Sequence, residues 1–111
     1  MALTTVATQP EPLRAMIEQI VRQFDPIRII LFGSRARDEA RFGSDYDLLV
    51  VLPEVEDKRR TAIAIRRALN SVPASKDIVV TTPEEIASRG NTIGFVLRPA
   101  LREGKVVYER G

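Results

Sequence analysis

Three aspartates and a Gly-Ser pair are the residues of this chain whose types and spacing could do chemistry. Asp45 and Asp47 stand two residues apart at the start of the apolar run YDLLVV. In an extended strand, side chains two apart leave the same face, with their Cα atoms about 6 to 7 Å apart. Both carboxylates can therefore reach one pair of divalent ions. Such a pair activates an attacking hydroxyl and stabilises the leaving oxygen in phosphoryl or nucleotidyl transfer.

Asp77 is the candidate for a third metal ligand. It opens the run DIVVT, and it can join the other two carboxylates if the two strands are neighbours in one sheet. A carboxylate buried there would need a partner for its charge, and metal coordination would provide one. Taken separately, the acidic residues have plainer interpretations: Asp45 can belong to the turn FGSD, and Asp77 can be a strand-end residue.

Gly33 and Ser34 follow the apolar run IRIILF. Glycine lets the backbone turn sharply, and Ser34 can cap a short helix beginning near Arg35, which would leave N–H groups and a hydroxyl pointing at one spot that suits an anion. Arg35 or Arg37 could neutralise phosphate charge. The plainer alternative is a helix start without a ligand. A site is favoured because the Gly-Ser pair and the aspartates each stand at one end of a predicted strand, and α/β sheets place their ligands at strand ends.

The composition limits the chemistry that is available. The chain has no Cys and no His, which excludes thiolate nucleophiles, Ser-His triads, imidazole catalysis and Cys/His zinc sites. Oxygen ligands favour magnesium, manganese or calcium. Seventeen Lys and Arg against fifteen Asp and Glu give a net charge of +2. With the arginines scattered along the chain, direct nucleic-acid binding is not expected.

Apolar periodicity predicts the elements that position these residues. A stripe with i, i+3, i+4 spacing predicts a first helix that begins near Pro12 and stops at Asp25-Pro26. Short runs rich in β-branched residues predict strands at 27–32, 46–51 and 77–81. A helix at about 56–70 would connect the second and third strands as a parallel crossover. The positions of the first stripe are Leu13, Met16, Ile17, Ile20, Val21 and Phe24.

The rest of the chain predicts a second helical part and a last strand. TPEE has capping-box spacing, so a helix should begin at Pro83. Residues 92–103 predict further helix, kinked or split at Pro99 and ended by Gly104. The following KVVY predicts a short edge strand.

The length and the apolar content predict one folding unit. At 111 residues and 44% hydrophobic composition, a single core can form without disulfides or a structural metal. We expect an α/β domain over residues 11–111, with a small mixed sheet flanked by helices, and a flexible tail over residues 1–10. Absence of Cys suits a cytoplasmic protein, and no apolar run is long enough to predict a membrane span.

The segment GSRARDEARFGSDYD resembles the signature of the polymerase-β-like nucleotidyltransferases, in which Gly-Ser is followed after ten residues by Asp-x-Asp. The length and the ending EGKVVYER are similar to the minimal (MNT) branch of that family, and the resemblance extends from about residue 11. It implies the polymerase-β-like fold. It also implies that Gly33 and Ser34 hold the triphosphate of ATP, with Arg35 as a further nucleotide-binding candidate. One departure is Asp38, where many relatives have glycine.

The same resemblance implies the roles of the aspartates and the kind of partner. Asp45 and Asp47 would bind two Mg²⁺ ions, and Asp77 would complete the catalytic metal site around the attacking hydroxyl. In the MNT branch the partner is typically a HEPN-domain RNase toxin, so the chain would be its antitoxin, transferring AMP from ATP to a toxin tyrosine. Two alternatives stay open. One is transfer to a small hydroxylated molecule such as an aminoglycoside, and the other is a non-catalytic module that blocks the toxin by binding.

The segment after the third strand predicts a partner interface. About thirty residues remain there, too few for a domain that binds an acceptor. Their apolar positions are more than one helix face can bury in so small a core, and exposed apolar surface commonly marks an interface. These positions are Ile93, Phe95, Val96, Leu97 and Leu101.

Overall fold

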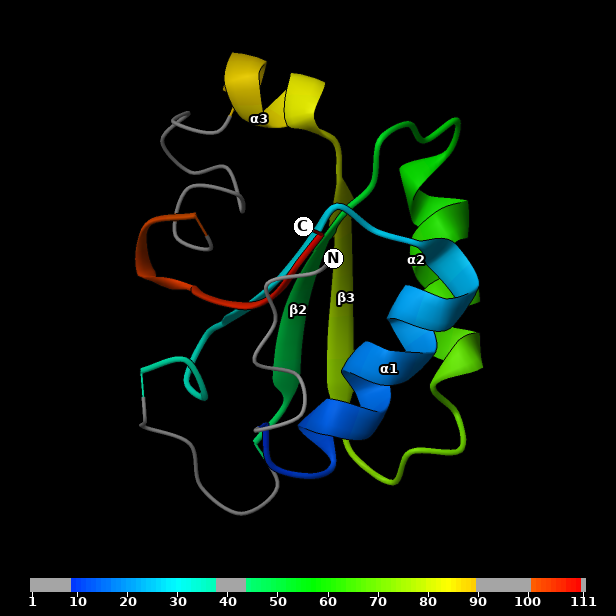
Figure 1. The fold of residues 1–111 in the computed structure, drawn as a ribbon, viewed down its shortest axis with the longest axis vertical. Helices are drawn as coiled ribbons and strands as arrows, with labels where there is room; N and C mark the ends of the chain where they lie inside the picture. Colours follow the sequence, from blue (N-terminus) through cyan, green and yellow to red (C-terminus); the bar gives the residue numbers. More distant parts are fainter. Residues whose placement is uncertain (1–8, 38–43, 90–100, 111) are drawn as a thin grey trace.

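The computed structural model describes residues 9–37, 44–89 and 101–110. They form a four-stranded sheet with helices α1 and α2 on one side and α3 beyond one end (Figure 1). This is the mixed α/β architecture that the sequence predicts. The helices are α1 (Leu13–Phe24), α2 (Lys58–Ala68) and α3 (Pro83–Arg89), and the strands are β1 (Arg28–Phe32), β2 (Tyr46–Val51), β3 (Lys76–Thr81) and β4 (Lys105–Glu109).

The strand order β3-β2-β1-β4 makes the sheet mixed. β2 and β3 are parallel, with α2 as the crossover between them, whereas β1 is antiparallel to both of its neighbours. The predicted parallel crossover is therefore confirmed. The predicted last strand is also confirmed, since β4 pairs with β1 at the edge of the sheet.

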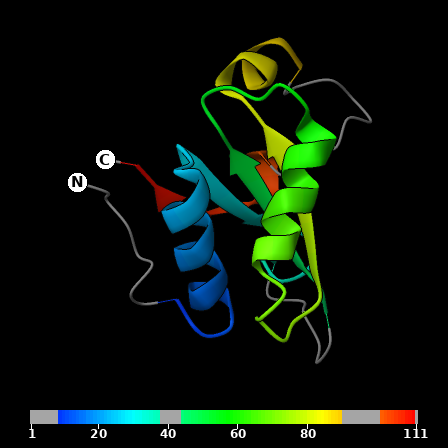
Figure 2. The ribbon, with the colours of Figure 1, turned by 90° about the vertical axis from the view of Figure 1, so that its right-hand side faces the viewer.

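One face of the sheet carries the main core. α1 and α2 lie side by side on it (Figure 2). In β1, β2 and β3, every second residue points into the same cluster because side chains alternate along a strand. The first four positions of the predicted α1 stripe are buried, and Val21 and Phe24 pack against the cluster half-buried. Buried members include Met16, Ile17 and Ile20 of α1, Leu31, Leu48 and Ile78 of the strands, Ile65 of α2, and Leu69, which directly follows α2.

The other face of the sheet carries a smaller apolar cluster. Ile30 and Leu49 are buried there, with Phe32, Val79 and Leu101 packed against them. Leu101 is half-buried in this cluster, so part of its apolar surface is covered within the domain, and the predicted partner interface stays a prediction. The other four apolar positions of that prediction lie outside the described residues.

Local sequence signals fix the ends of the helices. Asp25 follows α1 in the left-handed conformation, and its N–H donates to the Val21 carbonyl at 3.1 Å, before Pro26 prevents continuation. At α2, the Asp57 carboxylate accepts from the Arg60 N–H at 3.0 Å. Both ends follow the ordinary rules for satisfying the terminal N–H and C=O groups of a helix.

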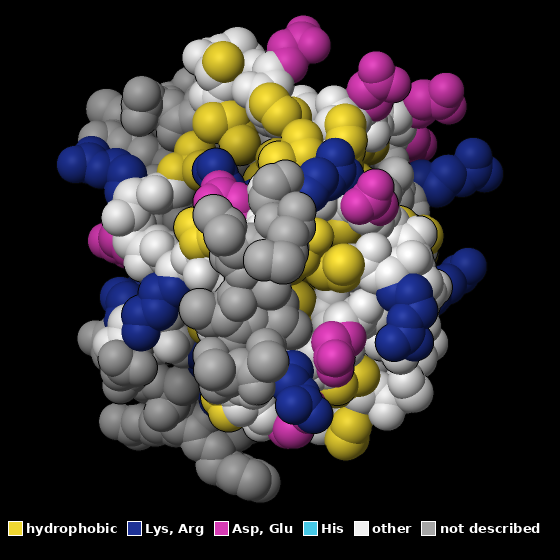
Figure 3. All heavy atoms as spheres, in the orientation of Figure 1, with side chains coloured by type: hydrophobic (Ala, Val, Ile, Leu, Met, Phe, Trp, Pro, Cys, Tyr) yellow, Lys and Arg dark blue, Asp and Glu magenta, His cyan; other side chains and the backbone are white. Residues whose placement is uncertain are grey.

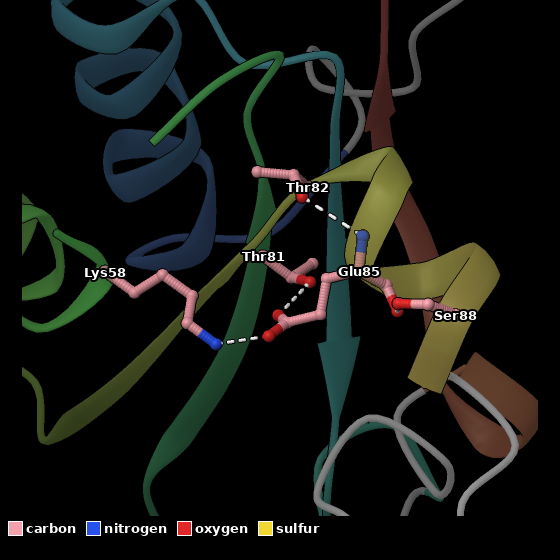
Figure 4. A network of polar contacts seen from close by, with 5 residues as sticks. All are labelled: Lys58, Thr81, Thr82, Glu85 and Ser88. Atoms are coloured by element: carbon pink, nitrogen blue, oxygen red, sulfur yellow. Dashed lines mark hydrogen bonds and ion pairs between the residues drawn. The ribbon is translucent and has the colours of Figure 1, made fainter. Parts of the chain in front are cut away.

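The start of α3 connects three elements (Figure 4). The Thr82 hydroxyl accepts from the Glu85 N–H at 3.2 Å, which confirms the predicted cap. The Glu85 side chain does not close the box; it accepts from the buried Thr81 hydroxyl at 2.6 Å and pairs with Lys58 of α2. Thr81 is fully buried, so its hydroxyl needs this acceptor.

Some expectations fall partly or wholly on residues that are not described. Residues 101–103 are helical and end before Gly104, whereas the remainder of the predicted 92–103 helix, with its kink at Pro99, lies outside the described residues. The flexible tail and the domain limits stay predictions. No helix within 9–37, 44–89 and 101–110 is long and apolar enough to cross a membrane.

Candidate active site

Strand register brings two of the predicted carboxylates together. Asp47 and Asp77 are direct partners in the parallel pair of β2 and β3, on strands that lie about 4.8 Å apart in such a sheet. Their neighbours Leu48 and Ile78 point into the core under the helices. Since side chains alternate, Asp47 and Asp77 lie on the opposite face, at the end of the sheet where both strands begin.

The third carboxylate, Asp45, lies one residue before β2 and is exposed. Partial burial raises the pKa of Asp47, and the negative charges of Asp77 and then Asp45 raise this pKa further, while Arg37 lowers it. The charges of Asp77 and Asp45 therefore act on the Asp47 carboxylate. Asp77 is exposed as well, so the burial that its apolar neighbours suggested is not found, because it lies near the start of an edge strand.

Gly33 makes room for the Asp47 carboxylate. It follows β1 directly, beside Phe32, which is the register partner of Asp47. Its φ of +76° lies in the region that favours glycine, and a Cβ built on it would overlap Oδ2 of Asp47 and lie 3.2 Å from its Cγ. Sequence reasoning predicted the sharp turn but missed this contact, for which the only sequence signal is a glycine placed directly after a strand.

Ser34 belongs to a turn closed by backbone hydrogen bonds. The Gly33 carbonyl accepts from the N–H groups of Ala36 at 3.1 Å and Arg37 at 3.3 Å. The helix predicted near Arg35 is therefore a turn over residues 34–37, and Asp38 lies outside the described residues. Within the described chain the Ser34 hydroxyl has no hydrogen-bond partner, and neither do the backbone N–H groups of Ser34 and Arg35. Such a turn suits an anion.

Arg35 fastens this turn to the segment before β2. Its Nε and Nη2 donate to the Ser44 carbonyl at 3.1 and 2.8 Å, and its guanidinium carbon lies 3.9 Å from the centre of the Tyr46 ring. These contacts hold the Gly-Ser turn beside the segment that carries Asp45 and Asp47. A nucleotide contact by Arg35 stays a prediction. The positive charge of Arg37, at the end of the turn, lowers the pKa of Asp47.

The donor set fits a hard divalent cation. Among the residues that the structure describes, no three acidic side chains are already gathered as a metal site, so Asp45, Asp47 and Asp77 would have to turn toward a common ion. Their oxygen atoms are the ligands that Mg²⁺ prefers. Besides burial, repulsion from Asp77 and Asp45 raises the pKa of Asp47, and a bound cation would remove this repulsion.

We expect ATP to bind at least about tenfold more weakly without magnesium, a difference of about 1.4 kcal/mol. Without a cation, three carboxylates would face a polyphosphate of the same sign. Titration calorimetry with magnesium and with a chelator measures the difference. Adenosine is the matched control, because it has no phosphates and should show no magnesium dependence. Equal ATP affinity in both conditions would contradict a metal site at these aspartates.

Ser34→Ala should weaken ATP binding several-fold and leave stability unchanged to within about 0.5 kcal/mol. The hydroxyl makes no hydrogen bond within the described chain, so its loss breaks no internal contact, while the N–H groups of the turn remain. Calorimetry and thermal unfolding measure the two quantities. Destabilisation by about 1 kcal/mol, the cost of a lost helix cap, with unchanged ATP affinity would instead make Ser34 a structural residue.

Comparison with known proteins identifies the class of domain. The family model described as "Nucleotidyltransferase domain" matches residues 13–105, whereas no curated protein matches. A Sulfolobus solfataricus protein assigned to the nucleotidyltransferases is similar in structure, with a TM-score of 0.58 and 19% identity over 83% of this chain and 72% of that one. A chain from a toxin–antitoxin structure with AMP-PNP has a TM-score of 0.54 and 22% identity over 86% of this chain and 72% of that one. At these identities, the two structures show a shared fold.

Proposed function

This chain belongs to the nucleotidyltransferase domain family, and from that premise we propose that it is a magnesium-dependent enzyme that transfers AMP from ATP to a protein tyrosine. The acceptor we propose is a HEPN-domain toxin, with this chain as its antitoxin. The observation that carries the proposal is the register pairing of Asp47 with Asp77 beside the turn at Gly33. The fold shared with a chain of a toxin–antitoxin structure that contains AMP-PNP supports the partner and the nucleotide.

The proposed reaction exchanges the phosphoanhydride bond between the α- and β-phosphates of ATP for a phosphodiester bond to tyrosine. The tyrosine oxygen forms a bond to the α-phosphorus of ATP, and the bond from that phosphorus to the oxygen bridging to the β-phosphorus breaks. Pyrophosphate leaves with the electron pair. The hydroxyl proton passes to the exposed carboxylate of Asp77 and from there to water.

The residues of the site have separate tasks in this reaction. The N–H groups of Ser34 and Arg35 would bind phosphate oxygens of ATP. Asp45, Asp47 and Asp77 would hold magnesium, which when bound neutralises phosphate charge and supports in-line displacement. Since Asp45 and Asp77 are exposed, a tyrosine on another protein can approach the carboxylates from solvent.

Label transfer tests this function. The chain is co-expressed with the product of the neighbouring gene, the complex is purified, and ATP labelled at the α-phosphorus is added. We expect label on the partner, on a tyrosine, and none when the ATP is labelled at the γ-phosphorus. Asp45→Asn with Asp47→Asn should remove the label without dissociating the complex.

Other results would support the alternatives. A complex that silences the partner equally well with both aspartates replaced, and that transfers no label, would make the chain a binding module. Label that appears only on an added aminoglycoside would make it an enzyme for small molecules. The negative charges of Asp77 and Asp45 beside Asp47 favour catalysis over binding alone, because a binding module has no use for this repulsion.

A further inference from the structure

The outward face of α2 gathers arginines that have no partners within the described chain. Arg59, Arg60, Arg66 and Arg67 are all exposed. None of their side chains makes a hydrogen bond or ion pair with any other part of the described chain. Figure 3 shows Lys and Arg side chains along the right-hand side of the molecule, where α2 lies in Figure 1. Although the arginines are scattered along the sequence, the helix places two pairs one heptad apart on one face.

The basic residues in the first turn of α2 are unfavourable for the helix by itself. α2 contains five basic residues and no acidic one, and three of the basic residues, Lys58, Arg59 and Arg60, occupy its first turn. Cations in the first turn oppose the helix dipole, whereas Arg66 and Arg67 in the last turn complement it. The exposed face of α1 is different, since Arg14 lies between Glu11 and Glu18 and pairs with both. A face kept only for solubility would resemble α1.

Ile63 lies in the middle of the four arginines. It is three or four residues from each of them, and the residue is 45% exposed. An apolar centre surrounded by arginines is the composition typical of protein–protein interfaces, in which arginine is enriched. A surface that binds the phosphate backbone of a nucleic acid would gain nothing from an exposed isoleucine at its centre. The pattern therefore favours a protein with an acidic surface over a nucleic acid.

We propose that this arginine face, formed by Arg59, Arg60, Ile63, Arg66 and Arg67, docks an acidic protein surface whose carboxylates pair with the arginines around an apolar contact at Ile63. This docking proposal rests on the proposed function in one respect, since it takes the toxin to be the acidic protein. α2 covers the sheet face opposite to Asp47 and Asp77. A protein docked on α2 therefore leaves Asp47 and Asp77 accessible from the other face. The surface that binds the partner is thus separate from the site that would modify it.

Charge reversal with a matched control tests the arginine face. Arg59→Glu with Arg67→Glu, and separately Ile63→Ser, are compared with Arg14→Glu plus Arg22→Glu, which change the net charge equally at exposed arginines of α1. Affinity for the neighbouring gene product is measured by calorimetry. We expect about a hundredfold loss for the first pair, the scale of two close interfacial charge pairs, a clear loss for Ile63→Ser, and less than about threefold change for the control and for Asp47→Asn. Unchanged ATP affinity would show that the folded site is retained.

The possible results separate this proposal from the proposed function. If partner affinity falls equally in the reversal and control pairs, or in neither, the docking proposal for the arginine face is overturned. The label-transfer experiment would still test the proposed function separately. Failure of the wild-type chain to bind the partner would overturn both proposals. A single-stranded RNA of about twenty nucleotides, longer than one small domain covers, is titrated in parallel. Salt-dependent RNA binding that the Arg59 and Arg67 changes remove and the control keeps would assign the face to nucleic acid and overturn the docking proposal.

Discussion

Asp47→Asn is expected to abolish nucleotidyl transfer while leaving the fold intact. The amide keeps the shape of the side chain, so the space beside Gly33 stays filled, but it removes the negative charge that holds a metal ion. Loss of one member of a catalytic group that acts as a unit commonly costs about three orders of magnitude or more in rate. We therefore expect a loss of about a thousandfold or more in labelled AMP transfer.

The same substitution should slightly raise stability at neutral pH. The folded state raises the pKa of Asp47 above its ordinary value of 3.8, so the folded chain binds more protons than the unfolded chain between the two pKa values. The stability of the wild type then falls as pH rises through that window, and it is recovered as pH is lowered. The substituted amide has no charge to titrate, so in the variant this part of the pH dependence should disappear.

Thermal unfolding from acid to neutral pH, together with the transfer assay, measures both effects. The free energy of unfolding of wild type and variant should converge at low pH and differ most at neutral pH, with the variant higher. Ser34→Ala is the control within the same site, since it removes no charge. A well-folded Asp47→Asn protein with wild-type transfer would show that this carboxylate is structural.

The elements could be predicted from the sequence because each has a local cause. The stripe from Leu13 to Phe24, the stop at Asp25-Pro26 and the β-branched runs depend on neighbours in the chain, and the observed ends differ from the predicted ones by one or two residues. The TPEE cap at Thr82 is equally local.

The site itself could be predicted only in outline. Motif order placed Asp45, Asp47 and Asp77 at strand starts, but the register that makes Asp47 the partner of Asp77 depends on how two distant strands align. The exposure of Asp77 follows from its place on an edge strand, which its apolar neighbours do not reveal. Leu101 packs against the second face of the sheet, and this contact cannot be recognised from spacing alone.

Gly33→Ala is expected to lower both stability and transfer, although alanine is only one carbon larger. The added Cβ would overlap Oδ2 of Asp47, and the φ of +76° is unfavourable for any side chain, at about 1 to 2 kcal/mol for the backbone alone. Either the turn or the Asp47 carboxylate must move. Displacement of a catalytic group by about 1 Å can cost about a hundredfold in rate, so we expect transfer to fall by about that factor.

A double-mutant cycle separates the two causes of this loss. In an Asp47→Ala background the carboxylate that the new Cβ would meet is absent, so Gly33→Ala should cost only the backbone strain, and its cost in free energy of unfolding should be smaller than in the wild type. Chemical denaturation of the four proteins gives the coupling energy. If Gly33→Ala costs the same in both backgrounds, the glycine serves only the turn and not the space of the carboxylate. A smaller cost without Asp47 would mean that Gly33 is required because the side chain of Asp47 occupies the position of its missing Cβ.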